Sequence, residues 1–175
     1  VTIKTNTKVI DFEKNDSSGI TSIIDKNGNH YFGEIFVDAS GNQGVFSKKI
    51  GLMEKNPIMA TGVEYNVKYK GDPSKAYLLI GKDYQGGYGW IFPLKNKRAI
   101  IGFGSLEPSI IKKLKPRLNH ILELKQIKKL VTKDNEKVEG GSIPITPVID
   151  QFVSDNLICV GDSVSQVNPI CGEGY

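Results

Sequence analysis

The sequence predicts an α/β chain of the α+β kind, in which an antiparallel sheet and a helical segment are inserted into a second domain. Three observations support this class. Apolar residues alternate with polar or small ones between 60 and 104, which indicates half-buried strands. An apolar stripe at helical spacing follows over 109–131. On either side, short apolar runs end in Asp38 and Asp162, and each leads into a glycine-containing turn, as central strands do.

The first segment predicts three strands and one short helix, at 1–11, 19–25, 30–39 and 43–52. The dipeptide Asn27-Gly28 is a strong hairpin signal between the second and third strands. The third strand runs into Asp38-Ala39-Ser40-Gly41, where small residues permit a close approach of the backbone to a neighbouring group. For so short a motif, a plain turn is the alternative.

The middle segment predicts a curved antiparallel sheet, with strands at 60–69, 76–80 and 98–104 and an aromatic strand between the last two. The aromatic strand reads Tyr88-x-Trp90-x-Phe92-Pro93. A period of two residues places its three rings on one face. Such a face builds either a hydrophobic core or the wall of an apolar pocket, and the residues alone favour the core.

The helical segment 109–131 contains Pro116, which should kink it or begin a second helix. Basic residues crowd this region with few acids, whereas the whole chain has a net charge of only +4. The simpler interpretation is a solvated helix face, and the alternative is a surface that faces anionic lipid. The basic residues are Lys112, Lys113, Lys115, Arg117, Lys125, Lys128, Lys129 and Lys133.

The last segment holds the most informative stretch. A buried strand over 156–160 ends in Gly161-Asp162, then come Asn168-Pro169 and the turn Gly172-Glu173-Gly174. This order places a carboxylate at the carboxyl end of a strand and a glycine-rich turn at an expected helix start, which is where nucleotide-like ligands bind in α/β sheets. An ordinary strand–turn–helix connection is the alternative, and the full spacing favours a ligand loop.

This stretch resembles the second flavin motif of the glutathione-reductase-type FAD enzymes. More narrowly, it is similar to the geranylgeranyl reductase family, the digeranylgeranylglycerophospholipid reductase-like FAD-dependent oxidoreductases, which carry Gly-Asp, Asn-Pro and Gly-Glu-Gly in this order. The aromatic strand resembles the same family, and the matching residues are Tyr88, Trp90, Phe92, Pro93 and Gly102.

The resemblance implies part of a glutathione-reductase-type FAD-binding domain at 1–56 and 146–175, with a substrate domain inserted at 57–145. By the same resemblance, Asp162 hydrogen-bonds the ribityl chain of FAD, and the backbone of Gly174 and Tyr175 faces the pyrophosphate or the flavin ring. The other expected cofactor residues are Gly161, Gly172, Pro169, Asp38, Gly41 and Val9. The five matching residues of the aromatic strand region would line an isoprenoid cavity.

The activity implied is FAD-dependent saturation of geranylgeranyl double bonds, most of all in archaeal-type glycerol ether membrane lipids, with a pigment precursor or a quinone as other substrates. An electron donor of the NAD(P)H or ferredoxin type would be needed. No catalytic acid is assigned, and neither a metal nor nucleic acid is expected. Two alternatives stay open: a flavin-dependent aromatic hydroxylase or halogenase of the same fold, and a non-enzymatic prenyl-lipid binding module.

Several general features of the sequence limit the class and the cellular location of the protein. Val1 lies inside a predicted strand and Tyr175 inside a predicted helix start, so an internal piece of a longer protein is expected, with the dinucleotide glycine turn before Val1. No apolar run is long enough to span a bilayer. Cys159 and Cys171 form no metal pattern, which favours a reducing, cytoplasmic setting. The basic segment adds the expectation of a peripheral position at the membrane.

Overall fold

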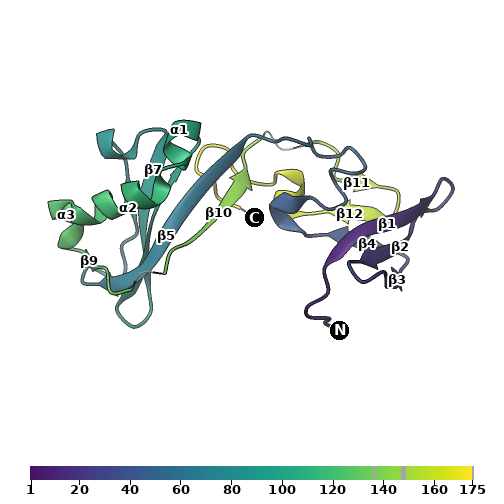
Figure 1. The fold of residues 1–175 in the computed structure, drawn as a ribbon, viewed down its shortest axis with the longest axis horizontal. Coiled ribbons are helices and arrows are strands. Elements are labelled where there is room, and N and C mark those ends of the chain that lie inside the picture. The colour runs from purple at the N-terminus through teal and green to yellow at the C-terminus, as the bar shows by residue number, and fades with distance from the viewer. Residues whose placement is uncertain (136, 147–148, 175) are drawn as a thin grey trace. The chain divides into compact units, whose positions relative to one another are not determined.

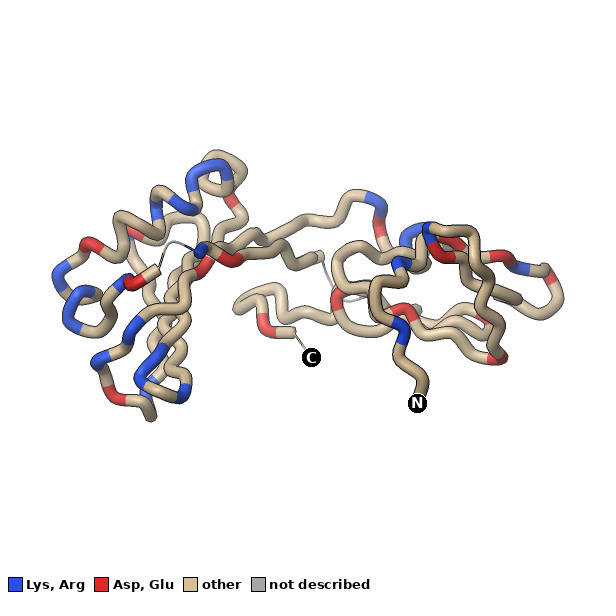
Figure 2. The backbone as a smooth tube through the Cα atoms, turned by 60° about the horizontal axis from the view of Figure 1, so that its bottom comes forward, with Lys and Arg blue, Asp and Glu red and all other residues tan. Residues whose placement is uncertain are grey.

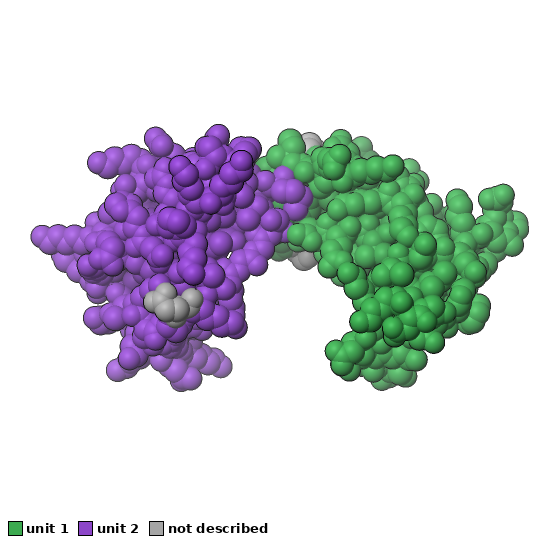
Figure 3. Space-filling model, viewed as in Figure 1, with its two compact units in different colours: residues 1–58, 143–175 green, residues 59–142 purple. Residues whose placement is uncertain are grey.

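The computed structural model describes residues 1–135, 137–146 and 149–174 (Figure 1). The chain divides into two compact units, coloured separately in Figure 3. Unit 1 consists of residues 1–58 and 143–175, and unit 2 of residues 59–142. Unit 2 is therefore a continuous stretch of chain that interrupts unit 1. The expected domain boundaries, at 56/57 and 145/146, lie within a few residues of these divisions.

The first sheet of unit 1 is antiparallel and has the order β1-β2-β3, with β1 at Val9–Asn15, β2 at Gly19–Asp25 and β3 at His30–Phe32. The predicted turn joins β2 to β3, and Gly28 has a φ of 82° there. The prediction of a strand over 1–11 is wrong in its first eight residues. Val1 and Ile3 are exposed, because β2 ends at Asp25, opposite Val9, and residues before Val9 face no partner strand.

The second sheet of unit 1 has the order β11-β12-β4, with β11 at Val153–Ser154, β12 at Leu157–Cys159 and β4 at Phe36–Asp38. Strands β12 and β4 are parallel, and Leu157 pairs with Phe36. The expected strand over 156–160 is confirmed at its centre. The expected single strand over 30–39 is wrong, because it breaks after Phe32 and its two halves belong to different sheets.

The predicted helix over 43–52 is also wrong. The chain forms a short 3-10 helix, η1, at Gly41–Gln43 and then a series of turns. Gly44, with a φ of 52°, ends η1. The side chain of Asp38 accepts the backbone N–H groups of Phe46 and Ser47, at 2.9 and 3.1 Å. These bonds hold the segment close to the end of β4, and the turns that follow contain only isolated helix-type bonds, from the Lys48 N–H to the Gly44 oxygen and from the Ile50 N–H to the Phe46 oxygen.

Unit 2 contains a six-stranded sheet of order β10-β5-β8-β7-β6, with β9 paired to β5. The pairs β5–β8, β7–β8, β6–β7 and β5–β9 are antiparallel, which confirms the sheet predicted over 60–104. A 3-10 helix, η2, at Lys82–Tyr84 precedes β7. The strands are β5 at Met59–Tyr69, β6 at Tyr77–Leu79, β7 at Gly87–Leu94, β8 at Arg98–Ser105, β9 at Val131–Thr132 and β10 at Glu139–Pro144.

Three short helices take the place of the single helical segment expected over 109–131: α1 at Pro108–Ile111, α2 at Leu114–Glu123 and α3 at Lys125–Lys128. Pro116 lies in the first turn of α2, where a missing N–H costs no helical bond. Leu118 and Ile121 of α2 are fully buried against Ile101 and Phe103 of the sheet. The helices therefore cover one face of the sheet, as Figure 1 shows, and the core of unit 2 lies between them.

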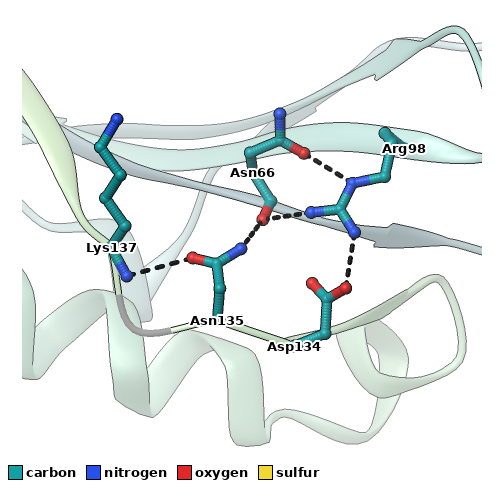
Figure 4. A network of polar contacts seen from close by, with 5 residues as sticks. All are labelled: Asn66, Arg98, Asp134, Asn135 and Lys137. Carbon is teal, nitrogen blue, oxygen red and sulfur yellow. Dashed lines mark hydrogen bonds and ion pairs between the residues drawn. The ribbon is translucent and has the colours of Figure 1, made fainter.

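A polar network fixes the segment after β9 to the sheet (Figure 4). The Arg98 guanidinium forms an ion pair with Asp134, with nitrogen and oxygen 2.6 Å apart, and donates to both the side-chain and main-chain oxygens of Asn66 at 2.8 Å. The Asn135 side chain donates to the same main-chain oxygen at 2.6 Å. The hydrogen bond from Arg98 lowers the pKa of Asp134 below its ordinary value.

The chain enters and leaves unit 2 at neighbouring points. The hydroxyl groups of Thr61, in β5, and Ser142, in β10, are 2.8 Å apart. On the side of unit 1, the Ile145 N–H donates to the main-chain oxygen of Ile58 at 2.8 Å. In the part of the chain that the structure describes, no helix is long and apolar enough to cross a bilayer.

Candidate functional site

Two loops follow the carboxyl ends of β4 and β12, residues 38–47 and 161–174, and they are here called the loop pair. Because β4 and β12 are parallel neighbours, their carboxyl ends lie at the same edge of the sheet. The Val160 N–H donates to the main-chain oxygen of Asp38 at 3.0 Å, and the Ser163 hydroxyl lies 2.8 Å from the same oxygen. The two loops are therefore joined at their origins.

The side chain of Asp38 shapes the first loop. It is buried, and its carboxylate accepts the N–H groups of Ser40, Phe46 and Ser47 at 2.9 to 3.1 Å. Three charge-assisted bonds of this kind hold a carboxylate in place and use its acceptor capacity. Asp38 therefore shapes the loop, and its contact with a cofactor stays a prediction. Gly41, with a φ of 65°, leaves the backbone of the loop open, since nothing lies within 4 Å of a Cβ there.

Asp162 begins the second loop, in the 3-10 helix η3 at Gly161–Val164. Among the described residues, its half-buried carboxylate has no hydrogen-bond partner in the structure. Gly161 has a φ of 65°, and nothing lies within 4 Å of a Cβ there. A Cβ on Gly174 would lie 3.9 Å from an oxygen of Asp162. An acceptor carboxylate is thus bordered by open glycine backbone, which is how a protein lets its main chain approach a ligand.

The turn that carries Gly172 and Gly174 is closed by Asn168. The Asn168 N–H donates to the Glu173 main-chain oxygen at 2.8 Å, and its own main-chain oxygen accepts the Gly172 N–H at 2.8 Å. Its side chain accepts the N–H of Ile170 at 2.9 Å, beyond the exposed Pro169. Sequence reasoning missed this organising role of Asn168, although an asparagine before proline is a turn signal.

Two expected cofactor residues stand apart from this description. Tyr175 lies outside the described residues. Val9 lies at the start of β1, where it pairs with Asp25 and packs against the core of unit 1. Its backbone contact with adenine stays a prediction.

The cysteines have different surroundings. Cys159 is buried in β12, and burial raises the pKa of its thiol to about 11. Cys171 lies in the second loop and is partly exposed. Within residues 1–135, 137–146 and 149–174, no group of His, Cys, Asp or Glu side chains could hold a metal ion.

The aromatic face in unit 2 consists of Tyr88, Trp90 and Phe92, on the face of β7 opposite the helices. Ile91, between them in sequence, is fully buried on the helix side. Tyr88 and Trp90 meet edge to face with centroids 5.8 Å apart, and Trp90 stacks on Phe92 at 6.3 Å. None of the three belongs to the buried core. The preference for a core role, taken from the residues alone, is therefore wrong.

Glycines make room for the central ring. The Trp90 indole lies over β8, where a Cβ on Gly102 would overlap it and one on Gly104 would be 3.4 Å away. A Cβ on Gly62, in β5, would come within 3.0 Å of the indole. Gly102 thus belongs to this face by providing space. Pro93 pairs with Ala99 and, by the two-residue period of a strand, lies on the other face of β7. Pro93 therefore lies apart from the three rings, and its place in a substrate site stays a prediction.

The comparison with solved structures defines the class of the fold. A geranylgeranyl bacteriochlorophyll reductase-like protein from Thermoplasma acidophilum matches with a TM-score of 0.81 and 21% identity, over 96% of this chain and 44% of that one. A flavin-dependent brominase matches with a TM-score of 0.69 and 19% identity, over 94% and 45%. The chain therefore has the mixed α/β fold shared by these two proteins.

Sequence relatives narrow the class. Digeranylgeranylglycerophospholipid reductase 1 of Methanosphaera stadtmanae is 31% identical over an alignment of 180 positions, gaps included, which covers 98% of this chain and 43% of the relative. A menaquinone reductase of Mycobacterium tuberculosis is 32% identical over 91 residues, which cover 50% of this chain and 22% of the relative. No protein-family model matches the chain. The chain is a distant homologue of the digeranylgeranylglycerophospholipid reductases, and it spans less than half the length of these relatives.

Proposed function

We propose that the protein is an FAD-dependent reductase that saturates the double bonds of geranylgeranyl chains, with archaeal-type glycerol ether membrane lipids as the substrate. The observation that carries this proposal is the match over 98% of the chain to a digeranylgeranylglycerophospholipid reductase. The aromatic face supports it, because a prenyl chain needs an apolar surface and the rings of this face lie outside the core.

The loop pair suits FAD. Asp162 offers an unengaged acceptor for a ribityl hydroxyl, and the open backbone at Gly41, Gly161 and Gly174 suits the approach of a bulky polar group. Glycine at these points matters because a side chain would block that approach. When bound, FAD supplies the hydride chemistry. The protein's own residues hold the cofactor, and Asp38 and Asn168 keep the two loops in shape.

The aromatic face would hold the prenyl chain. Phe92 is 43% exposed, and Leu78, directly opposite Trp90 on β6, is 63% exposed. Apolar groups at this exposure are available to a ligand, and burying them against a prenyl chain would exclude water from the double bond being reduced. No residue is assigned as the proton donor.

The partners that we propose are an electron donor of the NAD(P)H or ferredoxin type and the surface of an anionic membrane. Residues 108–133 contain eight basic residues and one acidic residue, whereas the whole chain has a net charge of +4. Figure 2 shows Lys and Arg gathered along the helical part of unit 2, and Lys133 follows β9. A cytoplasmic protein whose basic residues are attracted to anionic lipid headgroups would meet a lipid substrate at the membrane surface.

The test is reduction of a geranylgeranyl ether lipid by the intact protein, supplied with FAD and dithionite and followed by mass spectrometry. A gain of two hydrogens for each double bond supports the proposal. Oxygen-dependent hydroxylation or halogenation of a phenol, with the prenyl lipid unchanged, contradicts it. Halogenation is the kind of activity for which the brominase of similar fold is named.

A second candidate substrate has its own support. The menaquinone reductase that matches half of the chain is named for a prenylated quinone. Menaquinone is offered in the same assay in competition with the ether lipid, and its ring is reoxidised to the quinone before mass spectrometry, because dithionite alone reduces the ring. Only hydrogens added to the prenyl chains are then counted, and the preferred substrate is saturated first.

A further inference from the structure

Glu64 faces Trp90 across the sheet of unit 2. In the register of the strands, Glu64 of β5 is opposite Gly102 of β8, and Gly102 is opposite Trp90 of β7. The three residues form one row. Because Gly102 has no side chain, the indole extends over β8, and its Nε1–H donates to a carboxylate oxygen of Glu64 at 3.3 Å.

This hydrogen bond is the polar anchor of an otherwise apolar group. One face of the indole lies against the backbone at Gly62, Gly102 and Gly104, and the ring also stacks on Phe92. An indole N–H that is partly buried needs a partner, and Glu64 provides it. Without the carboxylate, the ring would lose the contact that fixes its rotation over the glycines, while its stacking partner would remain.

We propose that Glu64 is a positioning residue, which holds the Trp90 indole flat over the glycines and so sets the shape of the aromatic face that receives a prenyl chain. This inference rests on the proposed function for the identity of the ligand. Glu64 touches Trp90 and acts through it. The specificity of the face for a long, flat, unsaturated chain would thus depend on a carboxylate that is itself on another strand.

The test measures binding and the state of the ring separately from catalysis. Trp90 is the only tryptophan of the 175-residue chain, so intrinsic fluorescence reports on it directly once any tryptophan outside these residues has been changed to phenylalanine. Geranylgeraniol is the probe, and its affinity is measured by calorimetry. Glu64→Leu replaces the acceptor by a shorter apolar side chain, and Glu64→Gln keeps an acceptor oxygen. Glu139→Leu, which removes an exposed carboxylate paired with Lys137 on β10 of the same sheet, is the matched control.

We expect Glu64→Leu to make Trp90 fluorescence less polarised and more easily quenched by acrylamide, and to weaken geranylgeraniol binding about tenfold. Glu64→Gln should restore both properties, and Glu139→Leu should change neither. Trp90→Phe, which keeps a ring but removes the N–H, should weaken binding as Glu64→Leu does, and it serves as the second variant if Glu64→Leu fails to fold.

Unchanged fluorescence in Glu64→Leu, or unchanged binding in both Glu64→Leu and Trp90→Phe, would overturn the inference. The failure of the proposed function is a separate outcome. If the wild-type protein binds geranylgeraniol but reduces no prenyl lipid, the reductase proposal fails and the role of Glu64 in binding stands. If the wild-type protein does not bind geranylgeraniol, the aromatic face is not a prenyl site and both fail.

Discussion

The Ser163 hydroxyl and the main-chain oxygen of Asp38 are 2.8 Å apart, and both residues are buried. The same hydroxyl lies 2.8 Å from the main-chain oxygen of Val160. A single side chain thus joins the ends of two parallel strands that are distant in sequence. Because each carbonyl ends a strand of the loop pair, Ser163 controls how the two loops lie against each other.

Ser163→Ala should lower the free energy of unfolding by about 1 kcal/mol, since the Asp38 oxygen keeps its bond from the Val160 N–H. It should also increase the loss of FAD on dialysis, because the loops are less firmly joined. Urea unfolding and flavin absorbance measure the two effects. Ser18→Ala, at an exposed position of the same unit, is the control. Equal stability of the two variants would contradict the joining role.

In the full-length protein, Asp162→Ala should weaken FAD retention by removing a hydrogen bond to a charged group, worth ~1.5–3 kcal/mol. The fold should be little affected, because no described residue depends on this carboxylate. Flavin content after dialysis and the thermal melting temperature are the measurements. Asp150→Ala removes an exposed carboxylate of the same unit and should retain FAD as the wild type does. Unchanged flavin content in folded Asp162→Ala would remove this residue from the site.

Asp25 should make the stability of unit 1 depend on pH. Hydrogen bonds from the side chain of Asn29, and also from the Asn29 and Asn27 N–H groups and the Tyr31 hydroxyl, lower the pKa of Asp25 to about 2. A carboxyl with a depressed pKa stabilises the fold above its unfolded pKa of about 4, and this contribution is lost as the pH falls through the folded value.

Asp25→Asn should therefore be less stable than the wild type at neutral pH, and the difference should shrink between about pH 4 and about pH 2. Denaturant unfolding at a series of pH values measures it. Asp16→Asn, at an exposed turn position for which the structure gives no side-chain hydrogen bond, is the control and should follow the wild type. A stability difference that is constant down to about pH 2 would mean that the charge of Asp25 plays no part.

Trp90 and Phe103 form a matched pair for testing the aromatic face. Phe103→Ala, which empties a fully buried site on the helix side of the sheet, should cost ~3–5 kcal/mol. Trp90→Ala should cost less, because the indole lies outside the core, yet it should slow prenyl reduction or stop it after fewer double bonds. Thermal melting and product mass are measured on the same samples. The pocket proposal fails if Trp90→Ala is as destabilising as Phe103→Ala and leaves the products unaltered.

The basic segment should bind anionic vesicles in a salt-dependent way, because exposed charges are screened over ~10 Å at moderate ionic strength. Reversing Lys112, Lys125 and Lys129 to Glu should abolish sedimentation with phosphatidylglycerol vesicles. The control reverses three exposed lysines of unit 1, Lys14, Lys26 and Lys55, and makes the same change in net charge. If both triple variants sediment equally, net charge governs binding and the segment is an ordinary solvated surface.

The sheet of unit 2 was predictable because one of its faces is buried along its whole length. Tyr65, Val67 and Tyr69 alternate with polar residues in β5, and this alternation needs no knowledge of the partner strands. Residues 1–8 show why such patterns fail elsewhere. Val1 and Ile3 alternate equally well, but no strand of the described residues is opposite them, and a strand forms only where its hydrogen bonds are satisfied.

Some residues of the candidate site could likewise be predicted from the sequence, and others could not. Asp162 and the glycines around it could be found because strand, turn and ligand chemistry lie within one stretch of sequence. The hydrogen bonds that Asp38 accepts within its own loop could not be predicted. They depend on where the chain brings the backbone N–H groups of Phe46 and Ser47, eight and nine positions later. Glu64 was missed for a related reason. Its importance comes from the register of three strands and from the glycine between it and Trp90, neither of which its own neighbours in sequence reveal.

The neighbouring entry and exit points of unit 2 have a consequence for the order of folding. Phe36 leaves the ribosome long before its partner Leu157, so β4 must wait for β12 while all of unit 2 is synthesised. Once unit 2 has folded, the bond between Ile58 and Ile145 joins the flanks of the insertion, and the loop still to be closed is reduced to residues 36–58 and 145–157. A shorter loop loses less entropy on closing. We therefore expect the folded insertion to speed the late pairing of β4 with β12, on which the arrangement of the loop pair depends.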